Sequence, residues 1–314
     1  MTPGSTTRPR PARRRRSAPT LDLAGLLPSW ELTLRSERKA AQTVKSYGDG
    51  VRAFLRWCAD NDHSPALERD LVKGFTADLL DAGAEASTAR SRQLGVRRFS
   101  AWLAEEGEID DDPLLGLKSP KLDHKVTPSL SDDELRLLLK ACAGKDFRDR
   151  RDEAIVRLMA ETGMRAGEVC GLEVTDVDLA RGLVTVRKAK GGKARVAPFG
   201  PQVGVAIDRY LRARRGHLLA DTPALWLGDR GKSLEYYGLR KALKERADRA
   251  GLSSFHPHLL RHTAATRWLR AGGSEGGLMA VAGWSTRSMI DRYTGASASE
   301  RAATEARGLA LGDL

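Results

Sequence analysis

The stretch that decides the organisation of the chain is KSPKLDHKVTPSL, residues 118–130, followed directly by SDDE. It contains two prolines and no apolar periodicity, which predicts a linker rather than a helix or a strand. Ser131 and Glu134 then form a capping-box pattern, in which each side chain satisfies a backbone N–H at the start of a helix. Because a chain of 314 residues suits about two domains, we predict a domain boundary here, with the second domain beginning at residue 131.

Upstream of the linker, apolar residues recur at helical spacing in three segments, residues 38–62, residues 68–82, and a third from Ser87, the predicted N-cap, to Gly107. We expect the first clear helix to begin near residue 38. The third segment carries four arginines that suit a helix face laid against phosphates, namely Arg90, Arg92, Arg97 and Arg98. The pattern predicts an all-helical first domain over residues 21–117.

Downstream of the linker, helical patterns continue to Leu172, and two β-rich stretches then flank a turn that contains Gly191 and Gly192. These stretches cover residues 183–188 and 194–199. Later helices are expected near residues 201–215, 234–250, 257–271 and 274–293, with a short strand-like piece at 225–227. The predicted fold is mainly α with a small β-hairpin, in two domains.

The net charge of +12 and the pI near 9.9 favour a polyanionic partner. Residues 1–20 hold six arginines and no acid, among Pro, Ser and Thr, which predicts a disordered basic tail. Residues 21–120 hold 13 basic and 17 acidic side chains, and the remainder holds 34 and 24. Charge alone does not separate DNA from RNA or an anionic membrane.

Three cysteines lie far apart, without the spacing of a metal or redox pair, which favours a reducing, cytoplasmic location. No apolar run approaches the roughly 18 residues that span a bilayer. We also find neither a phosphate-binding glycine-rich loop nor clustered acidic metal ligands in the sequence.

Four short segments carry side chains suited to phosphate chemistry. They are ETGMRAGEV (161–169), KAKGGKARVAPFG (188–200), HPHLLRHTAATRWL (256–269) and AGWSTRSMIDRYT (282–294). Taken singly, each has an ordinary structural explanation, since Arg165 could be a helix-end charge and Tyr293 an amphipathic core residue. Their order and spacing make the combination specific.

In that order, residues 130–295 resemble the catalytic domain of the tyrosine recombinase, or phage integrase, family. The family's T-G-x-R-x-x-E element is matched by Thr162, Gly163, Arg165 and Glu168, and its hairpin lysine by Lys190. Its H-x-x-R element is matched by His258 and Arg261, continuing into His262 and Thr263. Tyr293 stands nine residues after Trp284, where the family has His or Trp. The upstream helical domain is similar to the family's core-binding, SAM-like domain.

The resemblance implies that the protein cuts and rejoins DNA through a 3′-phosphotyrosyl bond at Tyr293, with no metal or other cofactor. Arg165 and Arg261 are then a phosphate clamp, because fixed guanidinium groups stabilise charge that develops on the phosphate oxygens. Tyr293 has an ordinary pKa of about 10 and needs a base, for which His258 is the candidate. Lys190 is the expected acid for the departing 5′ oxygen.

Supporting roles follow for other residues. Trp284 can donate a hydrogen bond and pack beside Tyr293, but its indole cannot shuttle protons. Glu168 is expected to orient catalytic groups. Lys193 and Arg195, near Lys190, join the four helix arginines as candidates for DNA binding.

The expected partner is double-stranded DNA with specific core sites, bound by a homotetramer across two sites. The catalytic domain is expected over residues 131–297, and the Ala-rich tail, residues 298–314, is expected to dock onto a neighbouring protomer. No membrane partner is expected, and an accessory directionality factor stays open as a further partner.

Several functions fit this chemistry. We favour a mobile-element or phage integrase, with an Xer-like recombinase that resolves chromosome or plasmid dimers as the alternative. A type IB topoisomerase-like or telomere-resolving enzyme uses similar residues, but the size of the chain and the order of its elements favour recombination. A catalytically idle DNA-binding protein fits the scaffold, whereas an RNA-binding protein explains the charge and not the ordered motifs.

Overall fold

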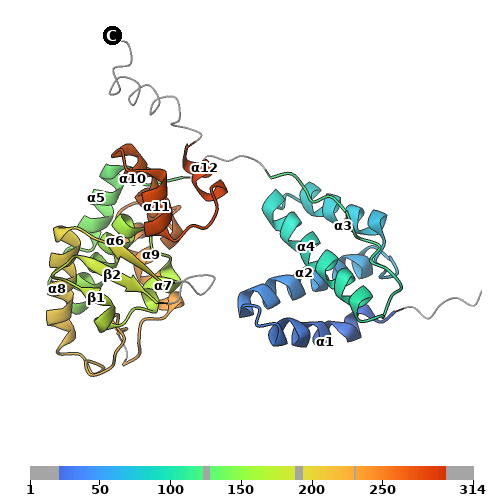
Figure 1. The fold of residues 1–314 in the computed structure, drawn as a ribbon, viewed down its shortest axis with the longest axis horizontal. Helices are drawn as coiled ribbons and strands as arrows, with labels where there is room; N and C mark the ends of the chain where they lie inside the picture. The colour runs from blue at the N-terminus through green and yellow to red at the C-terminus, as the bar shows by residue number, and fades with distance from the viewer. Residues whose placement is uncertain (1–20, 123–127, 188–193, 230, 295–314) are drawn as a thin grey trace, which may run out of the picture. The chain divides into compact units, whose positions relative to one another are not determined.

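We analysed a computed structural model of the protein, which describes residues 21–122, 128–187, 194–229 and 231–294. Contacts divide the chain into two units, residues 1–124 and 125–314. Helices dominate both units as drawn in Figure 1, and the described part of the second unit adds one three-stranded sheet, which confirms the predicted fold class. The basic tail, the glycine turn of the hairpin and the C-terminal tail lie outside the described residues.

The first unit contains four helices, α1 (Leu23–Ser36), α2 (Ala41–Asp60), α3 (Arg69–Asp81) and α4 (Ala86–Glu105). Their core is built around aromatic residues that are almost fully buried, among them Trp30, Phe54, Phe75 and Phe99. Such side chains bury large apolar areas, which stabilises a small helical unit.

Helix α1 was not predicted from the sequence, and the first helix therefore begins earlier than expected. Asp22 caps it, because its carboxylate accepts a hydrogen bond of 2.9 Å from the N–H of Gly25. The N-cap predicted at Ser87 is also wrong, since α4 begins at Ala86 with Glu85 as its N-cap. Glu85 makes no side-chain capping hydrogen bond, so this helix start lacks the sequence signal on which the prediction relied.

Helices α2 and α4 pack closely because both carry glycine where they meet. A Cβ atom added to Gly95 would lie 2.6 Å from the carbonyl oxygen of Tyr47, and one added to Gly50 would lie 2.7 Å from that of Arg92. Nearby, the hydroxyl oxygens of Ser46 and Ser91 are 3.3 Å apart. The glycines thus allow a backbone approach that a larger residue would prevent.

The second unit begins with α5 (Asp132–Ala141), α6 (Phe147–Thr162) and α7 (Ala166–Cys170). The predicted capping box at its start is confirmed, because the N–H of Ser131 donates to Glu134 at 2.7 Å and the N–H of Glu134 donates to the Ser131 hydroxyl at 3.2 Å. The N–H of Leu130 donates to Thr263 Oγ1 at 2.9 Å. The last residue of the predicted linker is therefore attached to α10 (Pro257–Arg270).

A short 3₁₀ helix (Val174–Asp176) leads into an antiparallel sheet of β1 (Val177–Asp178), β2 (Leu183–Val186) and β3 (Arg195–Pro198), in that order. In its register Val184 faces Ala197 and Val186 faces Arg195. No strand forms at 225–227, where one was expected. Two isolated bridges occur at the ends of this piece, Glu173 with Ala224 and Leu227 with Ser233. The hairpin strands themselves were predicted correctly.

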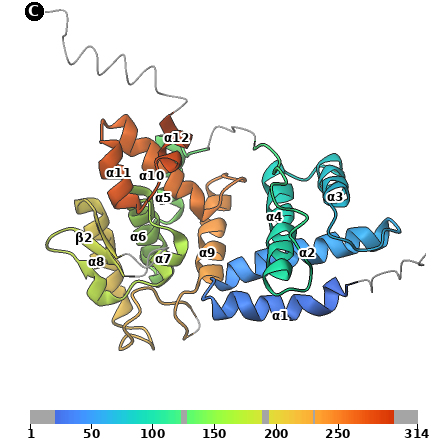
Figure 2. The same cartoon turned by 45° about the vertical axis from the view of Figure 1, so that its right-hand side comes forward.

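Besides α10, the later part of the described second unit contains α8 (Pro201–Arg214), α9 (Tyr236–Arg249), α11 (Glu275–Ala282) and α12 (Ser288–Thr294). The single helix expected over residues 274–293 is instead α11 and α12, because Gly283 adopts a left-handed φ of 65° and ends α11. In Figure 2, α10 and α11 lie beside one another, and the two helices also make direct contacts.

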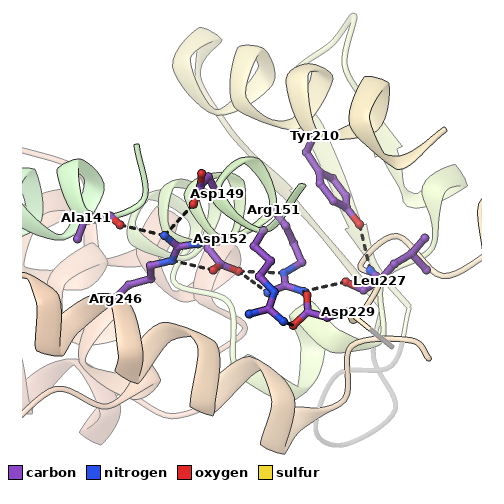
Figure 3. Close-up of polar contacts among 9 residues, drawn as sticks. Ala141, Asp149, Arg151, Asp152, Tyr210, Leu227, Asp229 and Arg246 are labelled. Carbon is purple, nitrogen blue, oxygen red and sulfur yellow. Dashed lines mark hydrogen bonds and ion pairs between the residues drawn. The ribbon is translucent and has the colours of Figure 1, made fainter. Parts of the chain in front are cut away.

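A buried ionic network fixes α6 against α9 (Figure 3). Asp152 on α6 accepts from Arg246 of α9 at 2.9 Å and from its neighbour Arg151 at 2.9 Å. Arg151 also donates to Asp229 at 3.0 Å and Arg246 pairs with Asp149 at 2.9 Å. Because buried charges are tolerated only with such partners, the network holds α6 against α9, and the end of α6 leads directly into the candidate site.

Within the described ranges, no helix combines the length and apolar character needed to cross a bilayer.

Candidate active site

The corner between α6 and α7 places the first arginine of the site. Thr162 donates its hydroxyl to the Leu158 carbonyl at 2.6 Å and accepts a longer contact, 3.4 Å, from the N–H of Met164. Gly163 then takes a left-handed φ of 62°, which L-residues with a Cβ adopt at a cost. This turn ends α6 and brings Arg165 to the N-cap position of α7.

The buried carboxylate of Glu168 accepts hydrogen bonds from two arginines. It accepts hydrogen bonds from the N–H of Arg165 at 2.8 Å and from its Nη1 at 2.9 Å. Arg195 of β3 adds a two-pronged contact, with Nη1 to Oε1 at 3.0 Å and Nη2 to Oε2 at 2.7 Å. Burial alone would raise the pKa of Glu168, but these hydrogen bonds and the arginine charges lower it below its ordinary value.

Arg195 was proposed from the sequence as a DNA-binding residue, which would suit an exposed side chain, but its side chain is largely buried. Its side chain is only 9% exposed and pairs with Glu168, and its Nε also donates to the Val281 carbonyl at 2.9 Å. A Cβ on Gly283 would lie 2.9 Å from its Nη1, so the α11–α12 turn fits closely over the guanidinium. Through these contacts Arg195 links β3, on which it lies, to α7 and α11.

Arg261 lies deeper than Arg165, because it is 2% exposed on α10, whereas the Arg165 side chain is 27% exposed. Its guanidinium donates to the carbonyl of Gly163 and, at 2.9 Å, to that of Ala282. Burial, and next the positive charge of Arg165, lower the pKa of Arg261 to about 10. The group is still charged at neutral pH, and an anion bound beside it would relieve part of this unfavourable environment.

Trp284 connects the buried arginine to the candidate nucleophile. The Arg261 guanidinium carbon lies 5.2 Å from the centre of its ring, within range of a cation–π contact. The Tyr293 ring stacks on it, with centroids 5.2 Å apart and an interplanar angle of 15°. A small apolar cluster that includes Leu269 and Ile290 supports both rings. The structure thus brings together three residues of the predicted set.

The tyrosine hydroxyl contacts a histidine that was not chosen from the sequence. Nδ1 of His262, half-buried on α10, is within hydrogen-bonding distance of the Tyr293 hydroxyl. His258, the predicted base, is exposed one helical turn earlier, and its ring meets His262 edge to face with centroids 4.5 Å apart. The signal that could have found His262 is its spacing, since residues i and i+4 share one face of a helix.

The remaining predicted residues belong to the first unit or lie outside the described ranges. Lys190 and Lys193 fall in the segment that the structure does not describe. On α4, Arg90 and Arg98 are exposed, while Arg97 donates to Ser119 at 3.2 Å and Arg92 pairs with Asp49 at 3.9 Å. Over the described residues, no group of three or more His, Cys, Asp or Glu side chains is arranged to hold a metal ion.

Comparison with known proteins matches both units. Residues 128–300 match the model of the phage integrase family, and residues 27–107 match that of the phage integrase N-terminal SAM-like domain. Tyrosine recombinase XerC of Mycobacterium tuberculosis (strain ATCC 25177 / H37Ra) is 32% identical over 264 residues, covering 82% of this chain and 88% of the relative. Tyrosine recombinase XerC of Corynebacterium glutamicum is 29% identical over 257 residues, covering 82% of each chain.

Solved structures share the fold. The XerH site-specific recombinase in a post-cleavage complex with palindromic difH superposes with a TM-score of 0.70 at 16% identity, covering 90% of this chain and 84% of that one. A lambda integrase tetramer bound to a Holliday junction gives a TM-score of 0.65 at 17% identity, covering 84% and 77%. With the family matches, these findings confirm the resemblance seen in the sequence. The chain belongs to the phage integrase family and is a tyrosine site-specific recombinase, an enzyme that breaks and rejoins DNA.

Proposed function

We propose that Tyr293 is the nucleophile that attacks the scissile phosphate, and that Arg165 and Arg261 hold that phosphate. The observation that carries the proposal is the contact of Trp284 with both the Arg261 guanidinium and the Tyr293 ring. This arrangement puts a phenol hydroxyl, a fixed cation and an indole in one small cluster. His258, the base predicted from the sequence, lies on the same helix as Arg261.

The electrostatics of the clamp support this proposal. Two charges about 4 Å apart interact by about 4 kcal/mol at an effective dielectric near 20, before desolvation is counted. Burial is the larger cause that lowers the pKa of Arg261 to about 10, and the charge of Arg165 adds to it. Arg165 and Arg195 already share the one carboxylate of Glu168, so the negative charge that would balance Arg261 is lacking. A phosphodiester supplies that charge, and its transition state concentrates more of it on the non-bridging oxygens.

In the proposed reaction the Tyr293 oxygen forms a bond to phosphorus, and the bond from phosphorus to the 5′ oxygen breaks. Lys190 gives a proton to the departing 5′ oxygen, which leaves a free hydroxyl on one DNA end and a 3′-phosphotyrosyl bond on the other. Because the phosphodiester energy is kept in that bond, the reverse attack by a 5′ hydroxyl rejoins the DNA. No ATP or metal takes part in these steps.

We further propose that the enzyme acts as a homotetramer on two double-stranded DNA core sites, in the cytoplasm. The lambda integrase structure is described as a tetramer on a Holliday junction, and the XerH structure as a complex with its difH site. Arg90 and Arg98, which are exposed on α4, are suited to phosphate contacts. We propose that residues 298–314 make contacts between protomers.

For the biological task we propose an Xer-like recombinase that resolves chromosome or plasmid dimers. The preference for a mobile-element or phage integrase, formed from the sequence, receives less support, because curated relatives at 29–32% identity are named tyrosine recombinase XerC. Their coverage of 82% of this chain extends through both units.

The experiment is covalent capture on a library of nicked duplexes with a randomised core. Cleavage beside the nick releases a short strand, so the protein stays attached to DNA under denaturing conditions. Wild type and Tyr237→Phe, a matched loss of an exposed hydroxyl, should both capture DNA, and Tyr293→Phe should not. An adduct that persists in Tyr293→Phe would overturn the assignment of the nucleophile.

Sequencing the captured DNA tests the biological task. A sequence that occurs once in the host chromosome, near its replication terminus, or on a multicopy plasmid supports dimer resolution. A sequence at the ends of a mobile element would instead return the proposal to an integrase.

A further inference from the structure

The structure places a second histidine against the reacting atom of the site. Nδ1 of His262 on α10 contacts the hydroxyl oxygen of Tyr293 on α12. The two rings are tilted by 42°, with centroids 5.4 Å apart. We propose that His262, rather than His258, takes the proton of Tyr293 as it attacks the phosphate; this rests on the proposed role of Tyr293 as the nucleophile.

The chemistry of the two groups fits a proton transfer. A phenol with a pKa of about 10 holds its proton at neutral pH, whereas an imidazole with a pKa of about 6.5 is mostly neutral and can accept one. In the contact the hydroxyl donates and Nδ1 accepts, which requires the His262 ring proton to be on Nε2. The tyrosine hydroxyl and its proposed base are thus in direct contact.

In the proposed step, Tyr293 attacks phosphorus and gives its proton to His262. The bond from the Tyr293 oxygen to phosphorus forms while its O–H proton moves to Nδ1 of His262, which becomes an imidazolium. The bond to the 5′ oxygen breaks, and that oxygen is protonated by Lys190. In rejoining, a 5′ hydroxyl gives its proton to Lys190 and its oxygen attacks phosphorus, while the bond from phosphorus to the Tyr293 oxygen breaks and His262 returns the proton to that oxygen.

The surroundings of His262 favour a proton transfer that is concerted with attack on the phosphate. Arg261 precedes it on α10, Arg165 acts electrostatically on Arg261, and His258 packs its ring edge to face against His262. The two guanidinium charges stabilise the negative charge that develops on the Tyr293 oxygen and oppose a second positive charge beside them. Proton transfer therefore accompanies attack, when the phosphate neutralises the arginines.

His258 acts in this scheme as a positioning residue. It lies one turn before His262 on the same helix, is exposed, and contacts the His262 ring at 4.5 Å between centroids. It restricts how the His262 ring can rotate. Its loss should therefore slow cleavage less than the loss of His262.

The test measures the single-turnover rate of adduct formation on a nicked duplex captured from the library. His262→Ala should slow the wild-type rate by about 10² to 10⁴-fold, the usual contribution of a general base. His262→Asn can place an amide oxygen near the position of Nδ1, which keeps an acceptor but cannot hold the proton, so it should be equally slow. His256→Ala, an exposed histidine that makes no side-chain capping bond at the start of α10, is the matched control and should react at the wild-type rate.

A second arm separates a base from a merely structural residue. A fluorinated tyrosine placed at position 293 ionises more readily, so it needs less help from a base. The rate loss caused by His262→Ala should then shrink at least tenfold relative to the loss measured with tyrosine. An undiminished loss would show that His262 only supports the structure, and would overturn the proposal even if His262→Ala folds poorly.

The outcomes also distinguish this proposal from the one on which it rests. If His262→Ala and His262→Asn cleave at the wild-type rate while Tyr293→Phe forms no adduct, His262 is not the base and Tyr293 is still the nucleophile. If Tyr293→Phe forms the adduct, the proposed nucleophile is wrong, and the base assigned to it fails with it.

Discussion

Replacing Arg195 with methionine tests how far the site depends on the buried carboxylate. Methionine keeps most of the aliphatic length but removes the 3.0 and 2.7 Å hydrogen bonds to Glu168 and the 2.9 Å bond to the Val281 carbonyl. The Glu168 side chain, 5% exposed, would keep its charge with only Arg165 as a partner. Removing one partner of a buried pair costs about 3–5 kcal/mol, so we expect a loss of unfolding free energy in that range.

The assay is native-state hydrogen exchange read by peptide mass spectrometry, because it reports each unit separately. Peptides of α6 should exchange about 10² to 4 × 10³-fold faster in Arg195→Met, which is the loss of about 3–5 kcal/mol expressed as a rate, whereas those of α2 should be unchanged. The double variant with Glu168→Gln removes both buried charges, so its cost should fall below the sum of the two single costs by about 2 kcal/mol or more. A single variant that loses under 1 kcal/mol, or a double variant whose cost is additive, would refute the reasoning.

The same variants separate folding from catalysis. If Glu168 positions Arg165 for the phosphate, the double variant should cleave slowly even where its stability is partly recovered. Cleavage at the wild-type rate in the double variant would show that the cluster only stabilises the fold.

Four further predictions follow from the described contacts. Gly95→Ala should destabilise the first unit, seen as a lower denaturation midpoint for peptides of α2 and α4, because its Cβ would lie 2.6 Å from a carbonyl oxygen; an unchanged midpoint would contradict the close packing. Ser131→Ala should cost about 0.5–2 kcal/mol of unfolding free energy, measured by urea denaturation, through loss of the capping box. Since the folded pKa of Glu168 lies below its ordinary value of 4.5, its stabilisation should be complete above that pH and be lost as the pH falls through the lowered pKa, a dependence that Glu168→Gln should remove from an acid titration. Burial raises the pKa of the Cys142 thiol to about 12, so a thiol reagent at pH 8 should label it only in denaturant; rapid labelling of the folded protein would contradict this.

Features with local signals were predicted well from the sequence. Ser131 and Glu134 identify a helix start by chemistry confined to four residues, and the capping box is present. The hairpin strands were recognised from β-rich composition on both sides of a glycine turn. The motif order identified the family because it depends on residue types and spacing alone.

Features that depend on tertiary contacts were missed. Helix α1 contains Pro28, which argues against a helix in the sequence, and it is stabilised by tertiary packing such as that of Trp30 on Phe99, with ring centroids 5.1 Å apart. Gly283 could have continued a helix by pattern, but its left-handed conformation ends α11 instead.

In the candidate site, too, local motifs predicted some residues, whereas contacts that depend on tertiary structure were missed. Arg261 and Tyr293 were chosen by motif, but the contact of Tyr293 with His262 depends on how α12 folds back onto α10. Likewise Arg195 was expected at the DNA because it is a basic residue near Lys190, and no local pattern reveals its pairing with Glu168 across 27 positions of the chain. Charge in a sequence indicates a partner without saying whether that partner is DNA or a buried carboxylate.

The most direct test of the central claim is to locate the DNA attachment on the chain. The wild-type adduct formed on a nicked duplex is digested with nuclease and trypsin, and the peptides are sequenced by mass spectrometry. We predict a nucleotide mass on the peptide YTGASASER, residues 293–301, with the modification on Tyr293. A nucleotide attached to any other residue, such as the exposed Tyr236 or Tyr237 of α9, would contradict it.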